Sequence, residues 1–149
     1  MTLTKAVSVC FSKYFDFTGR ATRSEFWWFY VFYLLITVFM DVADSVMGIT
    51  LQFAMFKLFV GLIFILPWIT VAARRLHDIG KSGWWQLVGA FTLVFGLILT
   101  GAADAAYAAE GLDEDLYISY AALIFAYSGV IFNMIQWVRP SQPGTNKWG

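Results

Sequence analysis

The stretch LYISYAALIFAYSGVIFNMIQWV, which runs from Leu116 to Val138, contains no charged side chain. A helix needs about 20 mostly apolar residues to cross a bilayer, and this stretch has that length and character. Three other runs along the chain resemble it, although the first of them includes Asp41 and Asp44. We therefore predict four membrane-spanning helices, at about residues 26–46, 51–73, 84–103 and 116–138.

The composition agrees with a membrane protein. Hydrophobic residues make up 60% of the chain and charged residues only 13%, whereas a soluble domain has about 25% charged residues. The long runs are apolar at both alternating positions, which argues against the strands of a membrane barrel. We predict an all-α, polytopic membrane protein in which residues 1–149 form a single integral-membrane domain.

The basic residues predict the orientation. Nine of the ten fall on one side of the predicted membrane: Lys5, Lys13, Arg20, Arg23, Arg74, Arg75, Lys81, Arg139 and Lys147. Loops rich in Lys and Arg stay in the cytoplasm. The N terminus, the C terminus and the middle loop are therefore predicted to be cytoplasmic.

The first residues do not have the pattern of a cleaved signal peptide, because AVSVC is too short for its apolar core. Apolar residues recur at helical spacing between residues 3 and 15, which predicts a short amphipathic helix on the inner membrane face. A packed or disordered leader is an equal alternative. Cys10 is the only cysteine, so an intrachain disulfide is excluded. We interpret it as an inert apolar residue.

The motif FTGRATRSEFWW precedes the first span. Thr22 and Glu25 have the spacing of a capping box, in which each side chain satisfies a free amide at the start of a helix. Gly19 permits a turn before the helix. Arg20 and Arg23 would lie at the headgroup level, where basic residues either anchor the topology or attract anionic lipid.

The motif RRLHDIGKSGWW, Arg74 to Trp85, contains the last letters of a phosphate-binding loop. That loop requires a glycine where Arg75 stands and follows a buried strand, so a nucleotide site is excluded. We predict a tight turn in which Gly80 and Gly83 adopt backbone angles that other residues avoid.

Three interpretations of this turn are open. Asp78 could pair with Arg20, Arg23 or Arg74 and hold helices together. The basic side chains could bind an anionic headgroup or phosphate. His77 and Asp78 could carry out acid–base chemistry. We place structural pairing first and catalysis last, because a single His beside an Asp, without a nucleophile, is a weak catalytic pattern.

Three motifs, KYFDFTGRATRSEFWWF, ARRLHDIGKSGWW and PGTNKWG, together resemble the YhaH-like family of bacterial inner-membrane proteins, a domain of unknown function. The resemblance implies a four-helix inner-membrane protein with cytoplasmic termini, and it implies no activity. In the tail, only Thr145 separates Pro143-Gly144 from Asn146, closer than in some members. The motif positions that we regard as structural are Gly19, Glu25, His77, Asp78, Gly80, Ser82, Gly83, Trp84, Trp85, Asn146 and Gly149.

Three charges lie near the outer ends of the first two spans. Lys57 could form an ion pair with Asp41 or Asp44, or all three could sit at the outer interface with Lys57 reaching toward water. We slightly favour the second alternative. Pro67 lacks an amide hydrogen and should kink the second span.

The last span has small residues at spacings of three and four, Ser119, Ala122, Ala126 and Gly129. This stripe predicts a face for close helix packing, either within one copy or between copies. We interpret the acidic segment 104–115 as a solvated turn, with a small amphipathic helix or a weak cation site as alternatives.

Two classes of function follow. The first is a non-enzymatic membrane module that binds an anionic lipid or a partner protein, and the second is a small transporter or channel subunit acting as a homo-oligomer. The middles of the spans lack charged residues, which favours the first class. We predict no metal, no cofactor and no nucleic-acid partner. One shared basic site would be lined by Arg20, Arg23, Arg74, Arg75 and Lys81, with Asp78 as counter-charge and Trp84 and Trp85 as membrane anchors.

Overall fold

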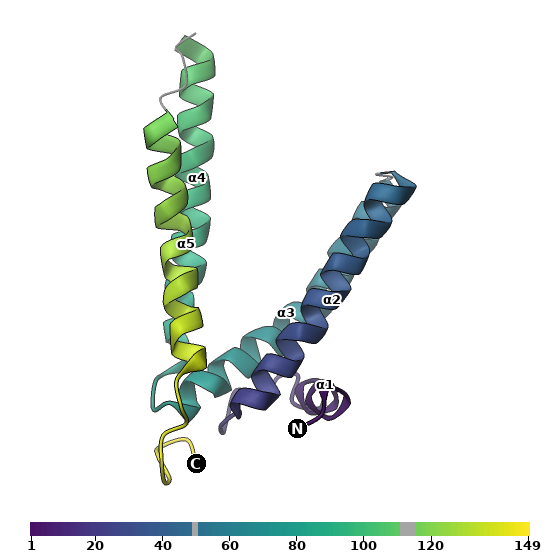
Figure 1. Ribbon diagram of the computed structural model, residues 1–149, viewed down its shortest axis with the longest axis vertical. Coiled ribbons are helices and arrows are strands. Elements are labelled where there is room, and N and C mark those ends of the chain that lie inside the picture. The colour runs from purple at the N-terminus through teal and green to yellow at the C-terminus, as the bar shows by residue number, and fades with distance from the viewer. Residues whose placement is uncertain (49–50, 111–115) are drawn as a thin grey trace. The chain divides into compact units, whose positions relative to one another are not determined.

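The computed structural model describes residues 1–48, 51–110 and 116–149. Its elements are α1 (Leu3–Ser12), α2 (Arg23–Met47), α3 (Leu51–Asp78), the 3-10 turn η1 (Gly83–Trp85), α4 (Gln86–Glu110) and α5 (Leu116–Val138), and these ranges contain no strand (Figure 1). Four of the helices are long and apolar enough to cross a membrane. The predicted fold class is confirmed.

The chain divides into two compact units. The first unit contains residues 1–83 together with the tail 140–149, and the second contains residues 84–139. Helices α1, α2 and α3 belong to the first unit, and α4 and α5 form the second.

Helices α2 and α3 of the first unit run side by side (Figure 1). Aromatic rings join them, because Phe26, Tyr30 and Tyr33 on α2 lie 5.5, 5.4 and 6.0 Å from the ring of Trp68 on α3. Helix α2 ends at Gly48, whose φ of +76° is readily adopted only by glycine.

Helix α1 confirms the predicted short N-terminal helix, although it ends at Ser12. The Thr2 hydroxyl caps it by accepting a hydrogen bond from the amide of Lys5. One face packs against α2 and α3, where Ala6 and Cys10 are completely buried. The helix is therefore packed on the protein as well as amphipathic.

Pro67 interrupts α3, and Figure 1 shows this helix bending between its two ends. Proline has no amide hydrogen, so the carbonyl four residues earlier, that of Ile63, lacks its usual helical donor. The Tyr14 hydroxyl donates a hydrogen bond to this carbonyl at 2.8 Å. Tyr14, in the segment after α1, thus supplies the hydrogen bond that the Ile63 carbonyl lacks within α3.

In the second unit, α4 and α5 pack along each other. A Cβ atom added to Gly96 on α4 would lie 2.5 Å from the Cβ of Ala126 on α5, and one added to Gly129 on α5 would lie 2.9 Å from the Val88 carbonyl oxygen. Both distances are too short for a side chain. The predicted small-residue stripe is confirmed as a packing face, and its contacts are within one copy.

The acidic segment 104–115 differs in part from the prediction. Helix α4 continues to Glu110, so the solvated turn is wrong for residues 104–110. The sequence there is rich in alanine, which has the highest helix propensity. Residues 111–115 lie outside the described ranges.

Candidate functional site

The end of α3 carries the residues that the sequence singled out. The helix runs to Asp78, so the first five residues of the predicted turn are helical. Gly80 has a φ of +78°, as predicted, but the φ of Gly83 is not positive. Gly83 is small for a different reason: a Cβ atom there would lie 2.8 Å from that of Ala73.

Asp78 accepts hydrogen bonds from two arginines and from the tail. Its Oδ1 accepts a hydrogen bond from Arg20 Nε at 3.0 Å, and its Oδ2 accepts hydrogen bonds from Arg75 Nη1 and the Ser141 hydroxyl. The Asp78 carbonyl accepts a further bond, of 2.8 Å, from the amide of Gln142. Asp78 is 4% exposed and Arg75 is completely buried. A charge buried in this way requires its partners.

Arg74 pairs with a different carboxylate. Its Nη1 lies 2.7 Å from Glu25 Oε1, and both residues are buried. Thr22 caps α2 as predicted, accepting a bond from the amide of Glu25 at 3.2 Å. The side chain of Glu25 does not close the capping box, however, because it neutralises Arg74. The predicted alternative that Arg74 pairs with Asp78 is therefore wrong.

The guanidinium of Arg20 fastens the tail to this end of α3. It donates hydrogen bonds to the carbonyls of Gln142 and Gly144, both at 2.7 Å, and to that of Gly149 at 3.0 Å. These bonds to backbone atoms use the planar, multi-donor geometry that lysine cannot supply.

His77 has a structural environment. Its ring is stacked on that of Trp148, with the centroids 4.5 Å apart, and its Nδ1 donates to the carbonyl of Gly19 at 3.2 Å. The Asn146 side chain donates to the His77 carbonyl at 3.0 Å. His77 and Asp78 thus make contacts of a structural kind, in agreement with the interpretation that we placed first from the sequence.

We call this interlocked group the clasp. It connects the segment before α2, the end of α3 and the tail through Arg20, Glu25, Arg74, Arg75, His77, Asp78, Ser141, Gln142, Asn146 and Trp148.

The residues of the predicted basic site are distributed unequally around the clasp. Arg20 and Arg75 meet at Asp78, and Arg74 lies on Glu25. Arg23 is exposed at the start of α2, and Lys81 is half-buried. Trp84 and Trp85 belong to the second unit, where they are 77% and 46% exposed.

Sequence reasoning missed Ser141 and Gln142, and it gave Trp148 no role at this site. One signal in the sequence could have indicated the tail. Its motif, PGTNKWG, occurs together with the other two motifs, which suggests that all three contribute to one site. The patterns within each motif could not show which segments touch.

Cys10 lies on the buried face of α1, near the pair of Glu25 and Arg74. Burial raises the pKa of its thiol to about 12, and the Glu25 carboxylate contributes in the same direction. A thiol that stays protonated is a poor nucleophile. This agrees with its interpretation as an inert residue. Within the described ranges, no three His, Cys, Asp or Glu side chains form a group that could hold a metal ion.

The comparisons with known proteins define the class. The profile of the family described as "Protein of unknown function (DUF805)" matches residues 14–149. The chain is 32% identical over 88 residues to "Inner membrane protein YhaH" of Escherichia coli (strain K12), an alignment that covers 58% of this chain and 73% of that protein. It is 31% identical over 86 residues to "Inner membrane protein YhaI" of the same strain, covering 58% and 71%. No solved structure matches.

Four apolar helices and inner-membrane relatives define a multi-pass inner-membrane protein. The chain belongs to the DUF805 family, which includes the YhaH-like proteins that its motifs resemble. The family match contains every residue of the clasp.

Proposed function

We propose that this protein is a non-enzymatic membrane module whose basic end binds anionic lipid headgroups. The basic end comprises residues 1–25, 74–83 and 140–149 of the first unit, and it contains eight basic and three acidic residues. Basic residues near an anionic surface each contribute about 1 kcal/mol of attraction. The proposal includes the predicted orientation, in which this end faces the cytoplasm.

The observation that carries the proposal is a local excess of positive charge around Asp78. Arg20 and Asp78 form an ion pair, Arg75 is buried on the same carboxylate, and Arg23 is near enough for its charge to act on Arg75. Two guanidinium groups therefore share one carboxylate, and a third, that of Arg23, adds its charge nearby. A phosphate group beside the exposed Arg23 would offset this excess of positive charge.

The proposal gives the residues of the predicted basic site two different roles. Arg74 and Arg75 are completely buried, so they support the clasp and do not present their charge to a ligand. Arg23 is exposed and is the residue best placed to meet a headgroup. Because His77 and Asp78 are held by structural contacts, the clasp supports a binding role over a catalytic one.

The test is native mass spectrometry in a mild detergent with added phosphatidylglycerol, using phosphatidylcholine as the uncharged comparison. Arg23→Gln should reduce phosphatidylglycerol binding about fivefold, the equivalent of about 1 kcal/mol. Lys5→Gln makes the same charge change at an exposed position in α1 and should have a smaller effect.

Equal phosphatidylglycerol binding by the wild type and Arg23→Gln would contradict the proposed headgroup site. The basic end would then be left with its structural role, or with a partner protein as its ligand. The same spectra count the subunits in each particle, which tests the predicted homo-oligomer.

A further inference from the structure

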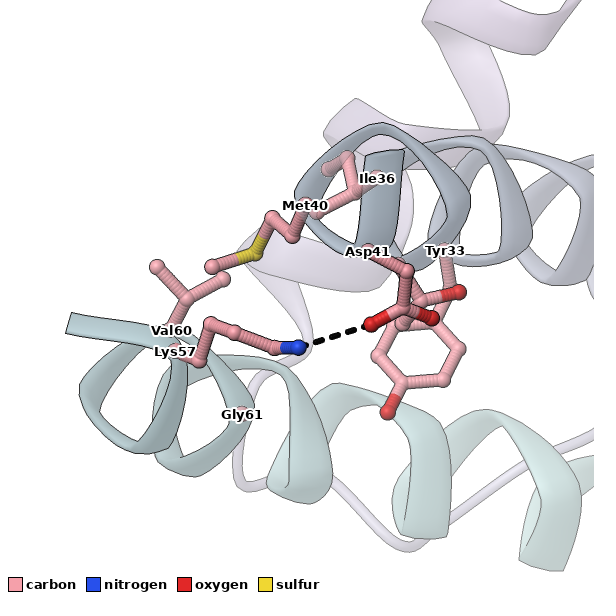
Figure 2. A pocket seen from close by; sticks show the side chains of 8 residues that line it. Tyr33, Ile36, Met40, Asp41, Lys57, Val60 and Gly61 are labelled. Carbon is pink, nitrogen blue, oxygen red and sulfur yellow. Dashed lines mark hydrogen bonds and ion pairs between the residues drawn. The ribbon is translucent and has the colours of Figure 1, made fainter. Parts of the chain in front are cut away.

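A cavity of about 190 Å³ lies between α2 and α3, far along the helix pair from the basic end (Figure 2). Asp41, which lines the cavity, follows Arg23 by 18 positions on α2. At 1.5 Å per residue this is about 27 Å, close to the thickness of the hydrocarbon core. If α2 crosses the membrane, the cavity therefore opens at the leaflet opposite the basic end.

Asp41 and Lys57 form the charged side of this cavity, and Asp44, which is not part of the lining, is a second partner of Lys57. The ammonium of Lys57 lies 2.7 Å from Asp41 Oδ1 and 3.3 Å from Asp44 Oδ2. Figure 2 shows Lys57 reaching from α3 to the Asp41 carboxylate on α2. The ion pair that the sequence allowed is present, and the three side chains together have a net charge of one negative unit.

The two carboxylates are not equivalent. The Asp41 side chain is 68% exposed, whereas that of Asp44 is 21% exposed. An exposed ion pair is worth little, so Asp41 can exchange its partner at small cost. Lys57 would keep Asp44 and could turn a released N–H group toward an anion. The cavity then presents a carboxylate and an ammonium next to each other.

The remaining lining suits the part of a lipid where the headgroup meets the acyl chains. Tyr33 contributes an aromatic ring that can attract a cation. Ile36, Met40 and Val60 form an apolar side. A ligand with an ammonium group, a phosphate group and an apolar extension matches these three features together.

We propose that this cavity binds the headgroup of a zwitterionic phospholipid that has a primary ammonium group. The ammonium donates to Asp41, the phosphate accepts from Lys57, and the first carbons of the lipid lie against the apolar side. This site is separate from the anionic-lipid site of the basic end and does not depend on it.

The experiment is native mass spectrometry of the full chain in mild detergent with added phosphatidylethanolamine or phosphatidylcholine of identical acyl chains. Phosphatidylcholine carries the same charges but has no N–H group to donate. We expect it to bind about tenfold more weakly, as does phosphatidylethanolamine in the Asp41→Asn variant, because each loses a charge-assisted hydrogen bond. Asp104→Asn changes an exposed carboxylate in the second unit and should bind as the wild type does.

A second variant fills the cavity without changing its charge. Gly61 lines the cavity, and a Cβ atom added to it meets no atom within 4 Å. Gly61→Leu should therefore fold normally and lose phosphatidylethanolamine about tenfold, since its side chain takes the space of the ligand. Gly101→Leu on α4, where an added Cβ is equally free, is the matched control.

Two results would overturn the proposal. One is equal binding of the two lipids, or of phosphatidylethanolamine by the wild type and both cavity variants. The other is displacement of the lipid by soluble phosphoethanolamine at millimolar concentration, which would assign the cavity to a soluble amino-phosphate compound in place of a lipid. Neither result would bear on Arg23 and the basic end, so the two proposals are tested separately.

Discussion

In the first unit, the end of α3 is joined to its neighbours by buried ion pairs, whereas in the second unit α4 and α5 meet through glycines. Asp78 and Glu25 neutralise arginines that have no contact with water. Gly96 and Gly129 instead bring two helix backbones close together. The first arrangement depends on a few charged groups, and the second distributes its stabilisation over many small contacts.

The difference has an energetic consequence. Buried charges add little net stability when paired, but each becomes very unfavourable when its partner is removed. Close packing is sensitive in another way, because a single inserted atom forces the two helices apart. Destabilising substitutions in the two units should therefore differ in size and in physical cause.

The largest effect should come from Asp78→Ala. This change leaves Arg75 buried without its carboxylate and removes the hydrogen bonds that Arg20 and Ser141 donate to that carboxylate. We expect the free energy of unfolding in mild detergent to fall by about 3–5 kcal/mol. Asp16→Ala, which removes a carboxylate 4.0 Å from Lys13, should change it by less than about 1 kcal/mol.

His77→Ala tests the part of the clasp that contains no ion pair. It removes the stacking on Trp148 and one hydrogen bond, so we expect a smaller loss than for Asp78→Ala, about 1–3 kcal/mol. Equal losses for the two variants in thermal melts would show that the ion pairs are not the main connection.

Gly96→Ala tests the second unit by inserting one methyl group. The new Cβ atom would lie 2.5 Å from that of Ala126, and we expect a loss of about 1–3 kcal/mol as the helices separate. Gly101→Ala is a matched control on the same helix, because its Cβ meets nothing within 4 Å. It should be neutral or stabilise the helix by up to about 1 kcal/mol. The measurement is chemical denaturation, and equal responses would contradict close packing at Gly96.

Tyr14→Phe tests the bond that satisfies the break in α3. The Ile63 carbonyl would lose its donor, at a cost of about 1–2 kcal/mol. In a Pro67→Ala background the amide of residue 67 can supply the missing bond, so the same substitution should cost less. A double-mutant cycle measures this coupling, and additive effects would show that Tyr14 stabilises α3 by other means.

The helices were predictable because their signal is local. Each span is a continuous apolar run, and the small-residue stripe on α5 predicted its close packing. The end of α3 was less predictable: charged residues 74–78 suggested a turn, yet α3 extends through them. Their charges are neutralised by partners from segments far away in the sequence.

The sequence predicted which residues belong to the candidate site better than it predicted which of them form pairs. The sequence identified Arg20, Glu25, Arg74, Arg75 and Asp78, but three-dimensional contacts decide which carboxylate meets which arginine. The tail was harder still. Its bonds to Arg20 are made by backbone carbonyls, and these carry no sequence signal.

The last prediction involves no loss of stability: it is the reactivity of Cys10 toward a thiol label. This reactivity tests how well α1 covers the Glu25–Arg74 pair. Its pKa of about 12 leaves almost no thiolate at neutral pH, and the packing of α1 on its neighbours buries the side chain completely. The folded protein should therefore resist maleimide, whereas the unfolded protein reacts. A Ser12→Cys variant in a Cys10→Ser background places the thiol on the exposed side of the same helix and should react readily. Rapid labelling of Cys10 in the folded protein would mean that α1 opens, and that the buried ion pair beneath it is reached by water.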